Sequence, residues 1–245
     1  MTEYFKAEWM KIPKGVILAV GLLFLALSSF IGLTIFFFNY DVLIENQMSR
    51  VLWGQLTFYN SQLLFPAMLA IFSAMILLPE FEQKTFEMLR ANHVSSRKLL
   101  MSKFLLMLIL VSIIQGVLFI IYLVTLYFSH IPFEMNDVYL CLRATVLSVV
   151  GSTSVLMLHS YIMVKTKNFA KSVGVAAIGS FAGFIFIMMG ELFNSVFPYS
   201  QPMIGIRSRA LVDMSIRELI VFLLVNIIYS TIFYYLTLRT LEKKD

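Results

Sequence analysis

The stretch FLLMLILVSIIQGVLFIIYLVTLY, residues 104–127, carries no charged residue. A bilayer hydrocarbon core about 30 Å thick is crossed by roughly 20 mainly apolar residues in a helix, so this stretch predicts a transmembrane helix. Similar apolar blocks recur on both sides of it. Together they predict six membrane spans, at residues 16–38, 56–78, 104–127, 138–164, 173–189 and 219–236.

The composition of the 245 residues agrees with this interpretation. Hydrophobic residues make up 60% of the chain and charged residues 13%, with a mean hydropathy of +0.86. Soluble domains average about 45–50% apolar and about 25% charged residues. We therefore expect an all-α membrane protein in which residues 1–245 form a single transmembrane domain. Residues 16–38 are too long for the apolar core of a cleaved signal peptide and predict a permanent first span.

The second block is interrupted by polar residues and a proline, namely Thr57, Asn60, Ser61, Gln62 and Pro66. Such groups are tolerated in a span when neighbouring helices satisfy the freed backbone, which predicts that this helix is buried among the others. An irregular helix that faces lipid is the alternative.

Basic residues are distributed unequally between the two sides of the predicted bundle. One side holds 14 of the 19, and lysine and arginine near span ends favour the cytoplasm. These are Lys6, Lys11, Lys14, Lys84, Arg90, Arg97, Lys98, Lys103, Lys165, Lys167, Lys171, Arg239, Lys243 and Lys244. The asymmetry predicts a multi-pass protein of the cell membrane with both termini in the cytoplasm. It also accounts for the net charge of +5 without a nucleic-acid partner.

An amphipathic segment precedes the first span. Phe5, Trp9 and Ile12 are spaced i, i+4 and i+7, which places them on one helical face. This spacing predicts a short helix in the headgroup layer, with the three residues as interfacial anchors. A frayed terminus is the alternative.

Motifs for catalysis or for metal and nucleotide binding are absent from the sequence. There is no glycine-rich loop before Lys84 and no H-E-x-x-H sequence, and Cys141 is the only cysteine. Serines of the fourth span lie close in sequence to His159, but Ser160 is adjacent to it and points in another direction. We expect no catalytic residue, no metal site and no cofactor in this chain.

Two ionisable residues, Arg143 and Glu191, lie near the outer ends of the fourth and fifth spans. Ionisable groups at membrane depth are candidates for function. The two side chains could pair with each other, contact a substrate, or serve as interfacial anchors.

Small residues recur at four-residue spacing in two spans. Gly179 and Gly183 form a G-x-x-x-G sequence, and Ala144, Ser148 and Ser152 repeat in the fourth span. Such faces allow helix backbones to approach closely. The contact could lie within this chain or with a second subunit.

The connection between the second and third spans, EFEQKTFEMLRANHVSSRKLLMSK at residues 80–103, contains a second amphipathic segment. Glu80, Lys84 and Glu87 share one face, since Glu and Lys at i, i+4 support a helix. The apolar residues pair as Phe81 with Met88 and Phe86 with Leu89. Exposed aromatics on a short helix favour docking into a groove on another protein. A solvated loop is the alternative.

This segment resembles the coupling segment of ABC-2 type permeases, the membrane subunits of a class of bacterial ABC exporters. The matching positions, in order, are Glu80, Thr85, Met88-Leu89, Val94-Ser95-Ser96-Arg97 and Lys103. The chain departs from the pattern with Lys84 where glycine is usual and His93 where proline is usual. The length and the six spans look most similar to lantibiotic-immunity and bacitracin-type permeases.

The resemblance implies a separate ATPase that binds ATP and Mg²⁺, and a second permease, identical or related. It also implies that the ATPase docks on a cytoplasmic coupling helix. The residues implied for this contact are Glu80, Phe81, Lys84, Thr85, Phe86, Glu87, Leu89 and Arg97. An amphiphilic substrate, such as an antimicrobial peptide embedded in the lipid bilayer, would then be expelled to give immunity.

Two other functions remain open from the residues alone. An ion-coupled secondary carrier would need polar residues at the midplane and commonly shows an inverted repeat, which the sequence lacks. An intramembrane enzyme would need a nucleophile beside a base.

Overall fold

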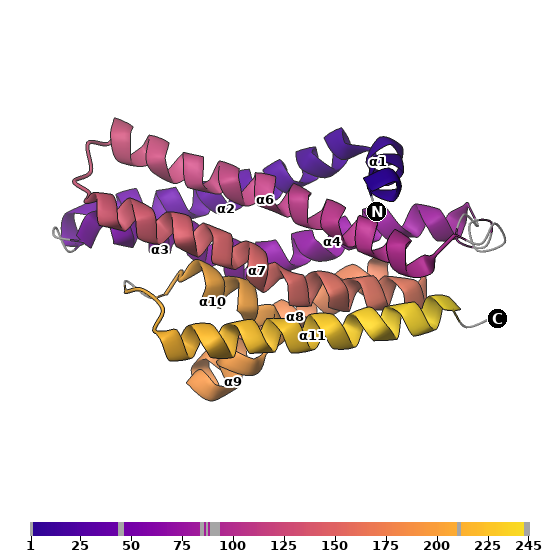
Figure 1. Ribbon diagram of the computed structural model, residues 1–245. Coiled ribbons are helices and arrows are strands. Elements are labelled where there is room, and N and C mark those ends of the chain that lie inside the picture. Colours follow the sequence, from indigo (N-terminus) through magenta and orange to yellow (C-terminus); the bar gives the residue numbers. More distant parts are fainter. Residues whose placement is uncertain are drawn as a thin grey trace.

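Helices form most of the chain in the computed structural model, which describes residues 2–43, 47–83, 86, 88, 94–209 and 212–242 (Figure 1). The α-helices are α1 (Thr2–Lys11), α2 (Lys14–Phe38), α3 (Met48–Tyr59), α4 (Phe65–Glu82), α6 (Ser96–Phe128), α7 (Met135–Thr166), α8 (Phe169–Met189), α9 (Glu191–Val196), α10 (Gln201–Ile206) and α11 (Ile216–Glu242). The shorter helical turns are η1 (Tyr40–Val42), the π-helix η3 (Asn60–Leu64) and η4 (Pro198–Ser200).

Six long helices have the length and apolar composition needed to cross a membrane, which confirms the predicted all-α membrane fold. Five of them are α2, α6, α7, α8 and α11. The remaining span, Met48–Glu82, joins α3, η3 and α4 into one helix. It begins eight positions before the predicted block because Leu52 and Trp53, although flanked by polar residues, are buried in the bundle.

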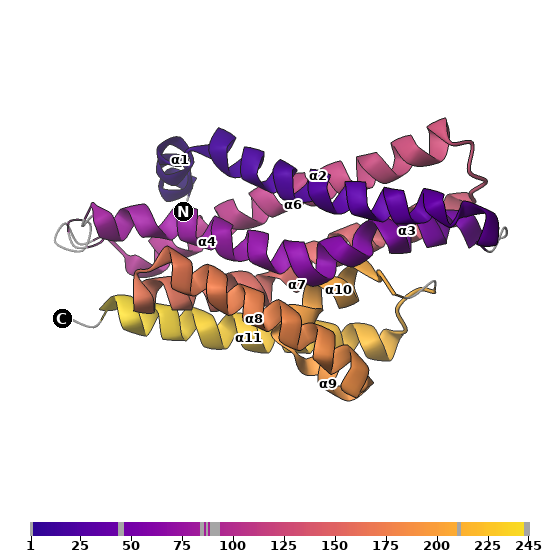
Figure 2. The ribbon, with the colours of Figure 1, turned by 180° about the vertical axis from the view of Figure 1, so that it is seen from behind.

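The two ends of the bundle carry different connections (Figure 1, Figure 2). We call the end with both chain termini the terminal end; among the described residues it also holds Gln83, residues 94–95 and the turn at 167–168. The opposite, distal end holds the connections described at residues 39–43, 129–134, 190–209 and 212–215. An even number of spans places both termini at the same end.

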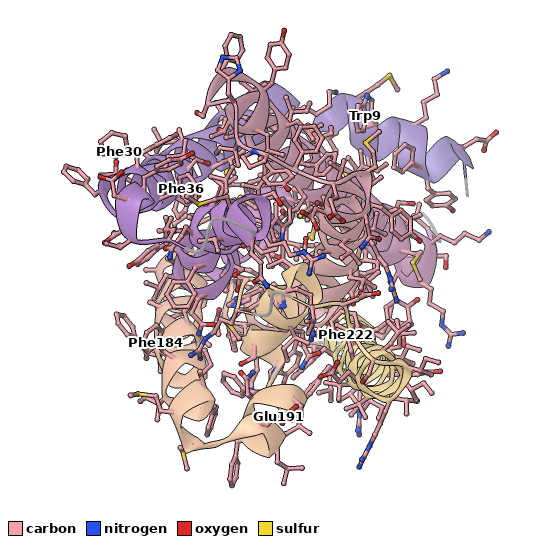
Figure 3. All side chains as sticks on the ribbon, turned by 90° about the vertical axis from the view of Figure 1, so that its left-hand side faces the viewer. Trp9, Phe30, Phe36, Phe184, Glu191 and Phe222 are labelled. Atoms are coloured by element: carbon pink, nitrogen blue, oxygen red, sulfur yellow. The ribbon has the colours of Figure 1, made fainter. Side chains whose placement is uncertain are left out.

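Helix α1 is seen end-on in Figure 1 and lengthwise in Figure 3, so it runs across the long axis of the bundle. It packs against α6 at the terminal end. This direction differs from that of every spanning helix. The prediction of a short N-terminal helix is therefore matched in the structure.

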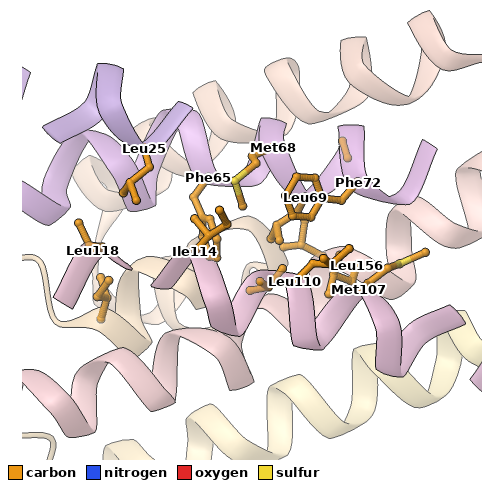
Figure 4. Close-up of a cluster of buried hydrophobic side chains, with 14 of the residues drawn as sticks. Leu25, Phe65, Met68, Leu69, Phe72, Met107, Leu110, Ile114, Leu118 and Leu156 are labelled. Carbon is orange, nitrogen blue, oxygen red and sulfur yellow. The ribbon is translucent and has the colours of Figure 1, made fainter. Parts of the chain in front are cut away.

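The second span lies at the centre of the core, as its polar residues predicted. Two thirds of its most apolar window is buried, against 17% for the corresponding window of α11. Figure 4 shows Phe65, Leu69 and Phe72 of α4 interleaved with residues of α6, such as Leu110 and Ile114.

Two amide side chains of that span donate hydrogen bonds to neighbouring helices. The Asn60 amide donates to Ser28 Oγ at 3.0 Å, and the Gln62 amide donates to the Ser180 carbonyl at 3.3 Å. Both donors belong to the π-helix η3, which widens the turn just before Pro66. A single π-turn inside a long helix is typical of functional regions.

The long distal connection folds back between the spanning helices. Its innermost residue, Tyr199 of η4, lies against Gly179, ten residues from the distal end of α8, which corresponds to a depth of about 15 Å. Helix α10 then returns outward along α7, where Gly151 and Gly205 allow backbone to touch backbone. The connection at 190–215 is therefore a re-entrant segment.

Candidate functional site

Four charged side chains meet where α1 crosses the terminal ends of α4 and α6. The Lys103 ammonium donates to a Glu8 carboxylate oxygen and, at 2.8 Å, to Oε1 of Glu80. Lys11 Nζ lies 2.5 Å from the same Glu80 oxygen and 3.8 Å from Glu8. We call Glu8, Lys11, Glu80 and Lys103 the ion cluster.

Three of the four side chains of the ion cluster are buried. Lys103 is fully buried, and Glu8 and Glu80 are 4% and 3% exposed. The two acids and two lysines balance in charge, which is the condition for keeping ions in a low-dielectric site. The cluster therefore joins α1, α4 and α6 through contacts that are costly to break singly.

The predicted coupling segment begins directly after this cluster. The rings of Phe81 and Phe86 lie 4.9 Å apart, and Lys167 Nζ is 5.6 Å from the Phe81 ring centroid. The sequence predicts a pairing of Phe81 with Met88 and does not predict the contact of Phe81 with Phe86. Lys84, Thr85, Glu87 and Leu89, the remaining members of the predicted segment, lie outside the described residues.

Arg97 and Glu80 have different exposure. Arg97 is exposed and lines a 270 Å³ hollow with Tyr235, Arg239 and Glu242 at the end of α11. Glu80 was also assigned to a partner contact, but its side chain is turned into the ion cluster. Its carboxylate accepts from Lys11 and Lys103 and does not face outward.

The predicted interfacial anchors face the protein. Ile12 belongs to the buried core, and Phe5 and Trp9 are partly buried against it, with their rings 6.0 Å apart. Lys14 Nζ lies 5.0 Å from the Trp9 ring centroid. The apolar stripe of α1 therefore packs on the bundle.

The small residues make contacts within the chain. A Cβ on Gly179 would lie 2.4 Å from the Tyr199 ring, and one on Gly183 would lie 3.0 Å from the Gln62 amide nitrogen. In α7, Ser148 lies beside Gly205 of α10. Ala144 and Ser152 are buried on the same helix. Both small-residue faces receive the re-entrant segment.

Arg143 and Glu191 do not pair with each other. Arg143 Nη1 donates to a carboxylate oxygen of Asp213 in the distal connection. Glu191 begins α9 and lines a separate cavity at the distal end. Figure 3 shows Glu191 on the opposite side of the bundle from Trp9.

A second buried charge, Asp137, was missed by the sequence analysis. Its carboxylate accepts from the Ser49 hydroxyl and, at 2.7 Å, from Arg50 Nε. These contacts clamp the start of α7 to α3 at the distal end. The available signal was weak, because Asp137 stands before the apolar block and resembles a solvated helix start.

His159 is the centre of a buried polar chain. Its Nδ1 lies 3.0 Å from Ser172 Oγ, and its Nε2 lies 3.1 Å from the Tyr199 hydroxyl. All three side chains are at most 5% exposed, and they join α7, α8 and the re-entrant segment. This histidine–serine pair has no access for a substrate and acts as a structural contact.

No group of three or more His, Cys, Asp or Glu side chains in the described ranges could hold a metal ion. The two clusters described above hold their acids with lysine, arginine and serine.

A comparison with models of known protein families identifies a match. A family model described as ABC-2 family transporter protein matches residues 4–183, which include the N-terminal helix, the ion cluster and the first five spans up to Gly183. No curated protein and no solved structure matches the chain significantly.

Proposed function

Because the chain belongs to the ABC-2 family of transporter proteins, and so is a membrane subunit of an ABC transporter, we propose that it is the permease of an exporter driven by a separate ATPase. The observation that carries the proposal is the position of Glu80 and Lys103, which stand at the two ends of the connection, in the ion cluster. Phe81, Phe86 and Arg97 of this connection lie at the terminal end, which would face the cytoplasm. ATP and Mg²⁺ would bind to the ATPase.

The contacts at the terminal end support a direct mechanical coupling. Phe81 and Phe86 form an aromatic pair at the start of the connection, and Arg97 lines an open hollow at its end. Aromatic and arginine side chains are the residue types that most often dominate the energy of protein interfaces. An ATPase bound between them would hold both ends of the connection.

The ion cluster would carry the movement into the membrane. Glu80 lies in the last turn of the central helix α4, and Lys103 belongs to the buried face near the start of α6, so a displacement of the connection would move both helices together with α1. Helix α4 continues into the π-helix, whose Gln62 contacts α8. The motion would thus reach the re-entrant segment through contacts of buried side chains.

We further propose an amphiphilic substrate, in the form of a lantibiotic or similar antimicrobial peptide whose removal gives immunity, and a partner permease. Apolar side chains of α8 and α11, such as Phe181 and Ile227, are 65% and 60% exposed. Such faces suit lipid or a second permease, identical or related.

The docking contact predicts a loss of partner binding on mutation. Phe86→Ala combined with Arg97→Glu should lower ATPase recovery with the tagged chain from membranes of the source organism by at least about tenfold, since interface aromatics and arginines often contribute 2 kcal/mol or more. Phe133→Ala, a change of a 49% exposed phenylalanine at the distal end, is the matched control. Equal recovery with both variants would remove the docking proposal.

The orientation predicts the labelling of introduced cysteines. The native Cys141 is buried, so Met135→Cys at the distal end and Glu82→Cys at the terminal end report separately. A membrane-impermeant maleimide should label Met135→Cys in intact cells, and Glu82→Cys only after the membrane is opened. The reverse pattern would place the connection outside and contradict the ATPase contact.

A further inference from the structure

A large cavity lies at the distal end, between α9, α10 and the first turns of α11. Its volume is about 960 Å³, at the upper end of the range for small-molecule sites. The cavity takes no part in the coupling described above.

One wall of the cavity is apolar and the rim is charged. The apolar lining is Ile187, Leu192, Val196, Met203, Ile204, Val221 and Phe222. The charged lining is Glu191, Arg207, Arg209, Arg217 and Glu218. Figure 3 shows that Glu191 and Phe222 come from neighbouring helices on one side of the bundle.

The two zones lie at different depths. Arg217 is at the start of α11 and Glu191 is two residues beyond the end of α8, so both stand at the level where the spans end. Phe222 is five residues further along α11, about 8 Å deeper. A membrane lipid has the same order, with its charged headgroup at the span ends and its acyl chains beneath.

The charged side chains of the rim differ in their partners. Arg207 donates to the carbonyls of Val212 and Asp213 and lies 3.6 Å from Glu218, so its position is fixed by the protein. No acid among the described residues lies within ion-pair distance of Arg209 or Arg217. Glu191 has no basic partner among these residues either. Two arginines and one glutamate are thus available to a ligand.

A buried polar atom also points to a ligand. The side-chain oxygen of Asn194, a lining residue, is buried without a hydrogen-bond donor among the described residues. A buried acceptor left unpaired costs about 1–3 kcal/mol, so such atoms normally have a partner.

We propose that this distal cavity binds a membrane phospholipid. Arg209 and Arg217 hold the phosphate, the apolar wall receives an acyl chain, and Glu191 accepts the ammonium group of an ethanolamine headgroup. The proposal depends on the membrane fold alone, so its failure would leave the ATPase-coupled function unchanged.

The experiment measures binding of short-chain lipids to the purified full chain in maltoside micelles, which contain no phosphate. Dioctanoyl phosphatidylethanolamine should bind at one site and more tightly than dioctanoyl phosphatidylglycerol. Arg209→Gln with Arg217→Gln should weaken binding at least about tenfold, since hydrogen bonds to charged groups contribute strongly. Arg239→Gln, an exposed arginine at the other end of the same helix, should leave binding unchanged.

Further variants and ligands separate the contributions of the two zones. Glu191→Gln should abolish the preference for the ethanolamine headgroup, and Val221→Trp should fill the cavity and reduce binding of both lipids. Equal binding of dioctanoylglycerol, which lacks a phosphate, would reduce the site to apolar adsorption and overturn the proposal. Equal binding of glycerophosphoethanolamine, which lacks acyl chains, would also overturn it, as would unchanged affinity in the double arginine variant.

Discussion

Lys103→Met is expected to lower the free energy of unfolding by about 3–5 kcal/mol, the cost typical of removing one partner from a buried ion pair. The ammonium of Lys103 is the contact shared by Glu8 and Glu80, and both carboxylates are buried. Without it, Lys11 is the remaining basic member of the cluster for two buried carboxylates. Lys11 lies 2.5 Å from Glu80 but 3.8 Å from Glu8, and its side chain is 39% exposed, so it compensates only in part.

Thermal unfolding of the purified protein in one detergent measures this effect. Lys171→Met changes an exposed lysine at the same end of the bundle and should alter the free energy of unfolding by less than about 0.5 kcal/mol. Adding Glu8→Gln and Glu80→Gln to Lys103→Met removes the unpaired charges and should restore much of the loss. If Lys103→Met were as stable as Lys171→Met, the three helices would not be joined by this cluster.

The burial of Lys103 could have been predicted from the sequence. Its charge contributes to the count that orients the membrane helices, yet Lys103 shares a helical face with Met107, Leu110 and Ile114, all of which are buried. A charge in line with an apolar stripe indicates a buried partner. Glu8 gives the same signal, because it lies between Phe5 and Ile12 on the stripe of α1.

The six spans were predictable because the lipid environment by itself requires a long apolar helix, whichever helices that segment packs against. The central place of the second span followed from Asn60 and Gln62, which need donors and acceptors from other helices. The re-entrant segment was not predicted. Its depth is fixed by contacts distant in sequence, such as Tyr199 with Gly179, and no local periodicity encodes them.

The ion-pair partners of the charged residues at the distal end could not be predicted for a related reason. Arg143 had several candidate partners, and the structure gives it Asp213 from a connection whose path depends on tertiary packing. Charge counts assign such residues to a side of the membrane. They do not determine which acid each arginine reaches.

Gly151→Ala is expected to destabilise the protein by about 3 kcal/mol, the upper part of the range for overpacking. A Cβ at this position would lie 2.5 Å from the carbonyl oxygen of Gln201 and 2.7 Å from its carbonyl carbon. Both atoms are backbone, so α10 would have to move away from α7. Trimming a side chain, as in Gln201→Ala, should therefore give no relief.

Gly179→Ala should behave differently, because the new methyl group meets a side chain. Its three closest contacts are ring atoms of Tyr199, the nearest at 2.4 Å. Tyr199→Ala removes that ring, so the double variant should lose less stability than the sum of the two single changes, whereas Gly151→Ala with Gln201→Ala should be additive. Gly116→Ala in α6, where no atom lies within 4 Å of the added carbon, should be tolerated. Thermal unfolding of these seven variants in one detergent tests whether the re-entrant segment is held by backbone contact at α7 and by side-chain contact at α8. A Gly151→Ala protein as stable as Gly116→Ala would place the segment elsewhere.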